Sequence, residues 1–101
     1  MMKEMVEKLI ELHELLHRLK ENYGTLRVYK DLVDLDEDVL RGKFGKLSEE
    51  EYKEREKELS DHQKMLSDIE KKIEETEKKI CSLLVEIVQK SGGKVLESKE
   101  R

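Results

Sequence analysis

The sequence has 101 residues, of which 46% are charged and 36% are hydrophobic, and its net charge is −4. This length predicts one domain. The lack of Trp and the few aromatic residues exclude a globule with a thick core, but they allow a helical pair, which needs only a narrow apolar seam. Acids and bases alternate finely along the chain, which argues against nucleic-acid binding. No apolar run approaches the length of a membrane span.

The first half of the chain carries apolar residues at alternating steps of three and four, the pattern of a coiled-coil seam. They are Met2, Met5, Leu9, Leu12, Leu16, Leu19, Tyr23, Leu26, Val33 and Leu40, with Lys30 and Glu37 at the polar seam positions. The pattern predicts a helix over about 2–41. An alternative breaks this helix near Gly24, so that residues 25–41 fold back as a third helix.

Glycines at 42 and 45 predict a turn over residues 42–47. Ser48 and Glu51 then have the spacing of a capping box, and a second seam pattern predicts a helix over about 49–90. Its seam positions are Tyr52, Arg55, Leu59, His62, Leu66, Ile69, Ile73, Thr76, Ile80, Leu83, Ile87 and Lys90. Residues 94–101 are expected to form a mobile polar tail beyond a single domain of residues 1–93.

Together the two patterns predict an all-α fold, an antiparallel coiled-coil helical hairpin. Pairing Leu40 with Tyr52 sets a register in which apolar residues face apolar residues along most of the seam. This register places Glu37 opposite Arg55. It also makes a poor layer of Lys30 and His62, so the half near the turn is expected to be weaker than the half near the termini.

Six further apolar residues lie outside the predicted seam, all in the half that carries the termini. They are Val6, Ile10, Leu15, Leu84, Val85 and Val88. A two-helix pair would expose them as an apolar patch. We therefore expect them to form an interaction surface, most simply one through which two hairpins join as a homodimeric four-helix bundle; a broader seam is the other interpretation.

One short string suggests chemistry. His13-Glu14-Leu15-Leu16-His17 resembles the H-E-x-x-H signature of zinc metallopeptidases over five residues. The resemblance implies zinc ligands at His13 and His17 and a general base at Glu14, with Glu75 as a possible third ligand from the second helix. However, Lys20 replaces the Gly of the longer metzincin pattern. The seam also turns these residues mostly outward, and the chain is too short to build a substrate cleft around a metal.

The sequence therefore predicts a non-enzymatic interaction protein, such as an adaptor, scaffold or small assembly subunit, without a cofactor. Its expected partner is a second copy of itself or another helical protein. A small zinc-dependent hydrolase and a holdase-type helical chaperone are the alternatives, the latter by analogy of shape with prefoldin alone. Cys81 is the only cysteine, which fits a reduced, cytoplasmic setting.

Overall fold

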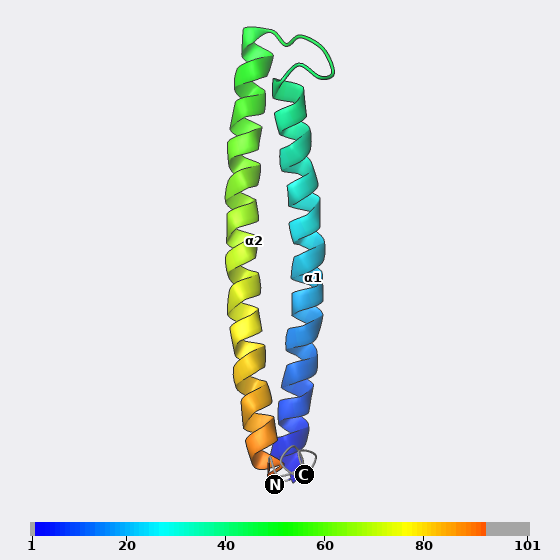
Figure 1. Ribbon diagram of the computed structural model, residues 1–101, viewed down its shortest axis with the longest axis vertical. Helices are drawn as coiled ribbons and strands as arrows, with labels where there is room; N and C mark the ends of the chain where they lie inside the picture. The colour runs from blue at the N-terminus through cyan, green and yellow to red at the C-terminus, as the bar shows by residue number, and fades with distance from the viewer. Residues whose placement is uncertain (1, 93–101) are drawn as a thin grey trace, which may run out of the picture. The chain divides into compact units, whose positions relative to one another are not determined.

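The computed structural model describes residues 2–92 and contains two long helices, α1 (Met2–Leu40) and α2 (Glu49–Lys90) (Figure 1). The predicted all-α helical hairpin is confirmed. α1 continues through Gly24 without a break, so the three-helix alternative is wrong. The predicted polar tail lies outside the described residues. Neither helix has an apolar stretch long enough to cross a membrane, as far as the described residues extend.

The turn begins with a helix cap that requires glycine. Gly42 has a φ of 82°, a left-handed backbone conformation that residues with a Cβ atom disfavour. Its N–H donates to the Val39 carbonyl at 3.0 Å, and the Lys43 N–H donates to the Asp38 carbonyl at 3.1 Å. These two bonds form a Schellman motif, which satisfies carbonyls that the end of α1 would otherwise leave unpaired.

The start of α2 has the predicted capping box. The Glu51 N–H donates to Ser48 Oγ at 3.2 Å, and the Ser48 N–H donates to Glu51 Oε1 at 3.1 Å. The hydrogen bond from the Ser48 backbone N–H lowers the pKa of Glu51, and a smaller effect of the Ser48 side chain lowers it further. An ionised Glu51 therefore fixes the first turn of α2 and the direction in which the chain leaves the loop.

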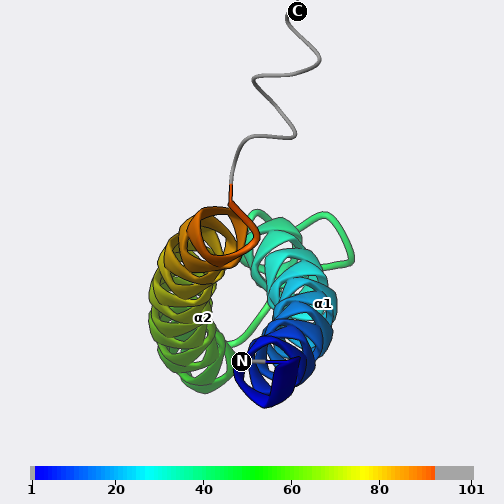
Figure 2. The ribbon, with the colours of Figure 1, turned by 90° about the horizontal axis from the view of Figure 1, so that it is seen from below.

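The described residues divide into two compact units. Unit 1 joins residues 2–20 of α1 to residues 74–92 of α2, and unit 2 comprises residues 21–73 with the turn. Within each unit the segments of α1 and α2 run side by side in opposite directions, as the side and end views show (Figures 1 and 2). Each unit is therefore a piece of two-helix hairpin with its own buried residues.

The buried positions of α2 agree with the predicted seam. Ile69, Ile73, Thr76, Ile80 and Leu83 are all less than 9% exposed. In unit 1, Leu15 of α1 forms a core cluster with Ile80 and Leu83, and partly buried apolar residues pack against it. These packed residues are Leu12, Leu19 and Ile87.

Half of the buried positions of α1 are the predicted ones. At the other half, the buried residue is the one just before the predicted residue. Met5, Leu12, Leu19, Leu26, Val33 and Leu40 are at least partly buried, as predicted. The alternate positions, however, are Lys8, Leu15, Asn22, Tyr29 and Asp36, in place of Leu9, Leu16, Tyr23, Lys30 and Glu37. Leu9 and Leu16 are 48% exposed, whereas Leu15 is 5% exposed, so the predicted place of Leu15 outside the seam is wrong.

A polar cluster in unit 2 explains why this face is buried. Asp36 is 1% exposed, and its carboxylate accepts hydrogen bonds from Arg55 Nη1 at 3.2 Å and His62 Nδ1 at 2.6 Å. The Tyr29 ring lies 6.0 Å from the His62 ring, centroid to centroid. The predicted seam would instead have put Lys30, a second donor, beside His62. A buried acceptor satisfies both donors of α2, and no buried side-chain N or O of the described residues lacks a partner.

The pairing of the helices is correspondingly offset from the predicted register. That register would place Lys8 opposite residue 84 and Asp36 opposite residue 56. Instead Lys8 Nζ lies 2.6 Å from Glu86 Oε2, and Asp36 is held between Arg55 and His62. In both units, residues of α1 therefore meet positions about two residues further along α2 than the sequence pattern predicts.

Candidate interaction surface

The H-E-x-x-H residues lie on the exposed surface of α1. His13, Glu14 and His17 are all exposed. A zinc site needs at least a third protein ligand, and the predicted one, Glu75, is not brought to them: in the described part of the chain no three His, Cys, Asp or Glu side chains come together in a way that could hold a metal ion. The geometry of this helix turn therefore does not build the zinc centre that the resemblance implies.

Five of the six residues predicted for the interaction surface are exposed. Val6, Ile10 and Val85 are each more than 50% exposed, and Leu84 and Val88 are 43% and 39% exposed. Leu15 is the exception, because it belongs to the core of unit 1. Because α1 buries a different face, Leu9 and Leu16, which the sequence pattern placed in the seam, are also exposed here.

These side chains are not spread evenly around unit 1. With heptad position a at Leu12 and Ile80 and d at Leu15 and Leu83, the exposed apolar residues of both helices fall at positions e and b. We call them the apolar face: Leu9, Leu16 and Val6 of α1, and Leu84 and Val88 of α2. Ile10 and Val85 are at f, which points away from the other helix. In an antiparallel pair the e positions of both helices flank the same side of the seam.

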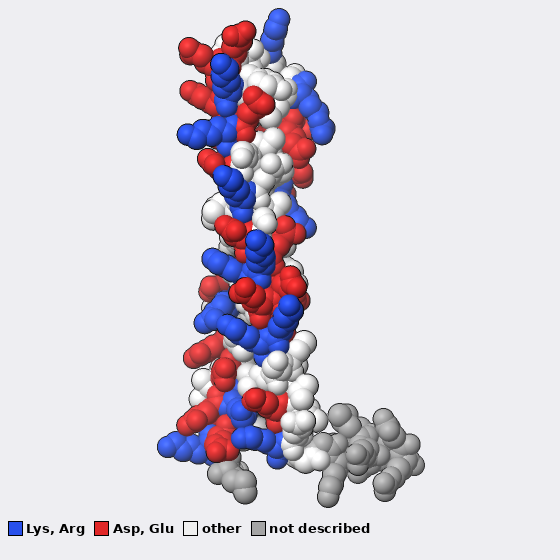
Figure 3. All heavy atoms as spheres, turned by 90° about the vertical axis from the view of Figure 1, so that its left-hand side faces the viewer, with Lys and Arg blue, Asp and Glu red and all other residues white. Residues whose placement is uncertain are grey.

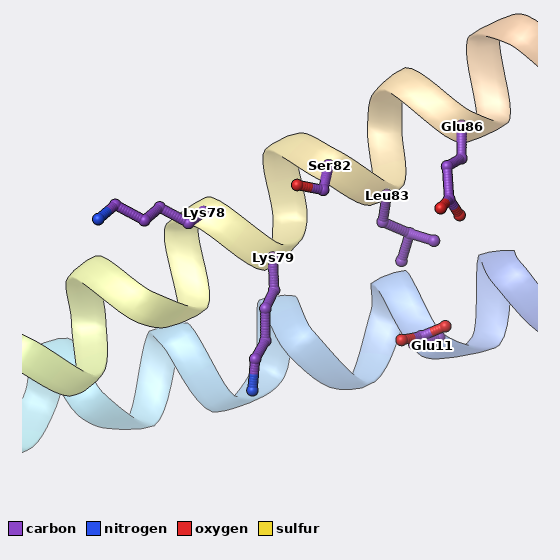
Figure 4. Close-up of a pocket in the computed structure, with 6 residues that line it drawn as sticks. All are labelled: Glu11, Lys78, Lys79, Ser82, Leu83 and Glu86. Carbon is purple, nitrogen blue, oxygen red and sulfur yellow. The ribbon is translucent and has the colours of Figure 1, made fainter.

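The opposite side of unit 1 carries charge. A shallow groove there is lined from both helices, mostly by residues at or next to position g (Figure 4). They are Glu11, Lys78, Lys79, Ser82, Leu83 and Glu86. Because this groove takes g residues from α1 and α2 together, it shows directly that the two g positions share one side, which leaves the e positions to the other. In the space-filling view, uncharged atoms gather along one edge at the lower end of the molecule (Figure 3).

Two ion pairs join the helices on the charged side. Lys8 Nζ bonds Glu86 at 2.6 Å, and Lys90 Nζ bonds Glu4 at 3.0 Å. The bond to Glu86 raises the pKa of Lys8, and the bond from Lys8 lowers the pKa of Glu86. Likewise the Lys90 ammonium lowers the pKa of the Glu4 carboxyl through their hydrogen bond. Four charged groups on this side are thus paired between the two helices, whereas the apolar face is left in contact with water.

The amino-acid sequence gave one signal for this arrangement. Leu15 and Leu16 are adjacent, so an apolar side chain is available whichever of the two faces of α1 is buried. Adjacent residues of a helix point in different directions, so Leu15 and Leu16 cannot both lie in a narrow seam. Burying Leu15 therefore leaves Leu16 on the surface.

Comparisons of the chain with protein-family models, with curated proteins and with solved structures found no match.

Proposed function

We propose that this protein is a non-enzymatic coiled-coil interaction protein that associates through the apolar face of unit 1, and that the helical partner on this face is a second copy of the chain. Two hairpins joined in this way form a four-helix bundle. The observation that carries the proposal is the one-sided distribution of exposed Leu and Val over both helices, opposite a charged side on which two ion pairs join the helices.

The apolar face can supply a free energy of the same order as the cost of association. Burying the remaining exposed half of a Leu or Val side chain contributes about 1 kcal/mol. The five residues of the apolar face, counted on both copies, therefore contribute on the order of 10 kcal/mol, which is comparable with the roughly 4–15 kcal/mol that association costs in lost freedom. Complementary packing and charge then decide whether the dimer is stable.

Replacing Val6 and Val88 by Ser tests the proposal. The double substitution changes four half-exposed Val side chains in a dimer. Because each Ser keeps the Cβ atom, the loss is less than the full contribution, about 3 kcal/mol, and should raise the dissociation constant about 100-fold. Sedimentation equilibrium measures this constant. Circular dichroism should show unchanged helicity, because neither side chain belongs to the core.

A matched control uses unit 2. Val28 and Leu35 are 56% and 46% exposed, close to the exposure of the Val residues on the apolar face. Replacing both by Ser removes a similar amount of exposed apolar surface and should leave the dissociation constant unchanged. Equal weakening by both pairs of substitutions would show that association is non-specific, and a monomeric wild-type chain would contradict the proposal itself.

A further inference from the structure

The two ion pairs of unit 1 establish which residues of α1 and α2 are level along the helices. Lys8 is level with Glu86, and four residues earlier on α1 Glu4 is level with Lys90, four residues later on α2. Equal steps along two antiparallel helices keep residues level, because both rise by about 1.5 Å per residue. The same count can therefore be continued to the end of unit 1.

Continuing the count places three residues of α1 level with three residues of α2 that share their heptad position, b. The pairs are Val6 with Val88, His13 with Cys81, and Lys20 with Glu74. All six residues are exposed. Within one chain the two members of a pair point apart, because position b lies on the outer edge of each helix, beyond position e. Each edge of the apolar face is thus a row of three residues matched in level and chemistry to the other edge.

The charges of the two edges are complementary. Between residues 2 and 20, positions e and b of α1 contain one cation, Lys20, and no acid. Positions e and b of α2 in unit 1 contain two acids, Glu74 and Glu77, and no Lys or Arg. A contact of α1 with α1 would therefore bring an unmatched Lys20 to the interface, and a contact of α2 with α2 would bring together acids. Only a contact of α1 with α2 matches the charges.

From these observations we propose the geometry of the dimer: a two-fold axis parallel to the helices places α1 of one copy on α2 of the other, at the same level. This inference rests on the proposed dimer. The axis preserves level, so Val6 meets Val88 of the second copy, His13 meets its Cys81, and Lys20 meets its Glu74, and each pair forms twice. Every helix then has antiparallel neighbours, which is the up-down arrangement of a four-helix bundle.

A disulfide between copies tests this geometry directly. In the His13→Cys variant the new thiol should lie within disulfide reach of the native Cys81 of the second copy. Mild oxidation by diamide should give a covalent dimer whose only cross-link, identified by peptide mass spectrometry, joins positions 13 and 81. The unsubstituted protein should give no covalent dimer, because Cys81 lies far from Cys81 of the second copy. The variant that also carries Cys81→Ser should give none either, because position 13 lies far from position 13 of the second copy.

The other outcomes separate this inference from the proposed function. A link between two residues 13 or between two residues 81 would overturn the geometry. So would a link within one chain, or the absence of any link in a sample with the native mass of a dimer. In these cases the proposed dimerisation would stand. A monomeric native mass for the unoxidised wild-type protein would instead remove the dimer on which the inference depends.

Charge reversal provides a second test that needs no cysteine chemistry. Glu74 already pairs with Lys78 of its own helix at 3.3 Å, and Lys20 of the second copy would join this exposed group. Lys20→Glu alone should raise the dissociation constant about fivefold, since two such surface pairs are lost per dimer.

Adding Glu74→Lys to Lys20→Glu should restore the constant to within about twofold of wild type, since the pair is re-formed with its charges exchanged. The matched control adds Glu75→Lys instead. Glu75 is the neighbouring acid, at heptad position c on the charged side, and its reversal should not restore association. Equal rescue by both, or rescue by neither, would overturn the proposed pairing.

Discussion

Replacing Asp36 by Asn tests the account of why α1 buries the face that it does. Asp36 is 1% exposed and accepts hydrogen bonds from two side chains of α2, at 3.2 Å from Arg55 and 2.6 Å from His62. Asn has the same shape but no charge, so the substitution isolates the electrostatic part of the cluster. The amide oxygen can still accept a hydrogen bond from Arg55, while the amide N–H₂ faces His62 Nδ1, which can accept it only in the tautomer that carries no proton on Nδ1.

The expected loss can be estimated from the exposure of the partners. Hydrogen bonds to a charged group contribute about 1.5–3 kcal/mol each, so two of them set an upper limit of roughly 3–6 kcal/mol. The Arg55 and His62 side chains are 35% and 25% exposed, and Arg55 also bonds Glu58 at 3.0 Å, so both can regain some solvation or pairing. We therefore expect Asp36→Asn to lower the free energy of unfolding by about 2 kcal/mol.

Urea denaturation followed by circular dichroism, at one fixed protein concentration, measures this change. Two acids on the same helix are controls. Asp34 is exposed, and Glu37 is the residue that the sequence pattern placed opposite Arg55. Asp34→Asn and Glu37→Gln should each change the free energy of unfolding by less than about 0.5 kcal/mol. A loss for Glu37→Gln as large as that for Asp36→Asn, or no loss for Asp36→Asn, would refute the assignment of the buried face.

Three further predictions concern the core and the helix ends. Leu15→Ala should lower the free energy of unfolding by about 2–4 kcal/mol, whereas Leu16→Ala should chiefly weaken association, as denaturation and sedimentation of both variants will show. Glu51 has a lowered pKa, so its capping contribution is present above its unfolded-state pKa and is lost as the pH falls through the folded-state pKa; a pH titration of stability should show this loss in wild type and not in Glu51→Gln. Gly42 has a φ of 82°, so Gly42→Ala should cost about 1 kcal/mol in the same denaturation assay.

Local patterns in the sequence predicted the helices and their ends correctly. The glycines of the turn, the capping box at Ser48 and the seam of α2 each depend on interactions within a few residues. The structure confirms the turn and the capping box, and it confirms the seam from Arg55 to Ile87. The two end positions of the predicted seam, Tyr52 and Lys90, are exposed. Such interactions can be read from the sequence because the partners are fixed by spacing alone.

The buried face of α1 could not be predicted in the same way. Counting apolar residues favours the face with Leu9, Leu16 and Tyr23, but the structure buries the one with Leu15, Tyr29 and Asp36. The choice depends on what α2 presents to α1, namely two donors, Arg55 and His62, that require a buried acceptor. That is a contact between segments distant in sequence, and no periodicity within one helix contains it.

Because the contact of Asp36 with Arg55 and His62 selects the buried face of α1, it also decides which residues of α1 are exposed on the candidate surface. Val6, Leu84 and Val88 were found from the sequence because they lie outside either possible seam. Leu15 was assigned to the surface and Leu9 and Leu16 to the core, and both assignments were reversed when α1 buried its other face. The pairing of the two edges of the apolar face depends on the ion pairs of unit 1, which only the structure provides.

The molar mass of the unmodified protein in solution, measured by sedimentation equilibrium over a range of micromolar concentrations, shows whether the chain dimerises. We expect a reversible approach to twice the mass of one chain, and a return to the mass of one chain when Val6 and Val88 are both replaced by Ser. A wild-type protein that keeps the mass of a single chain throughout would contradict this expectation, because the apolar face would then remain in contact with water.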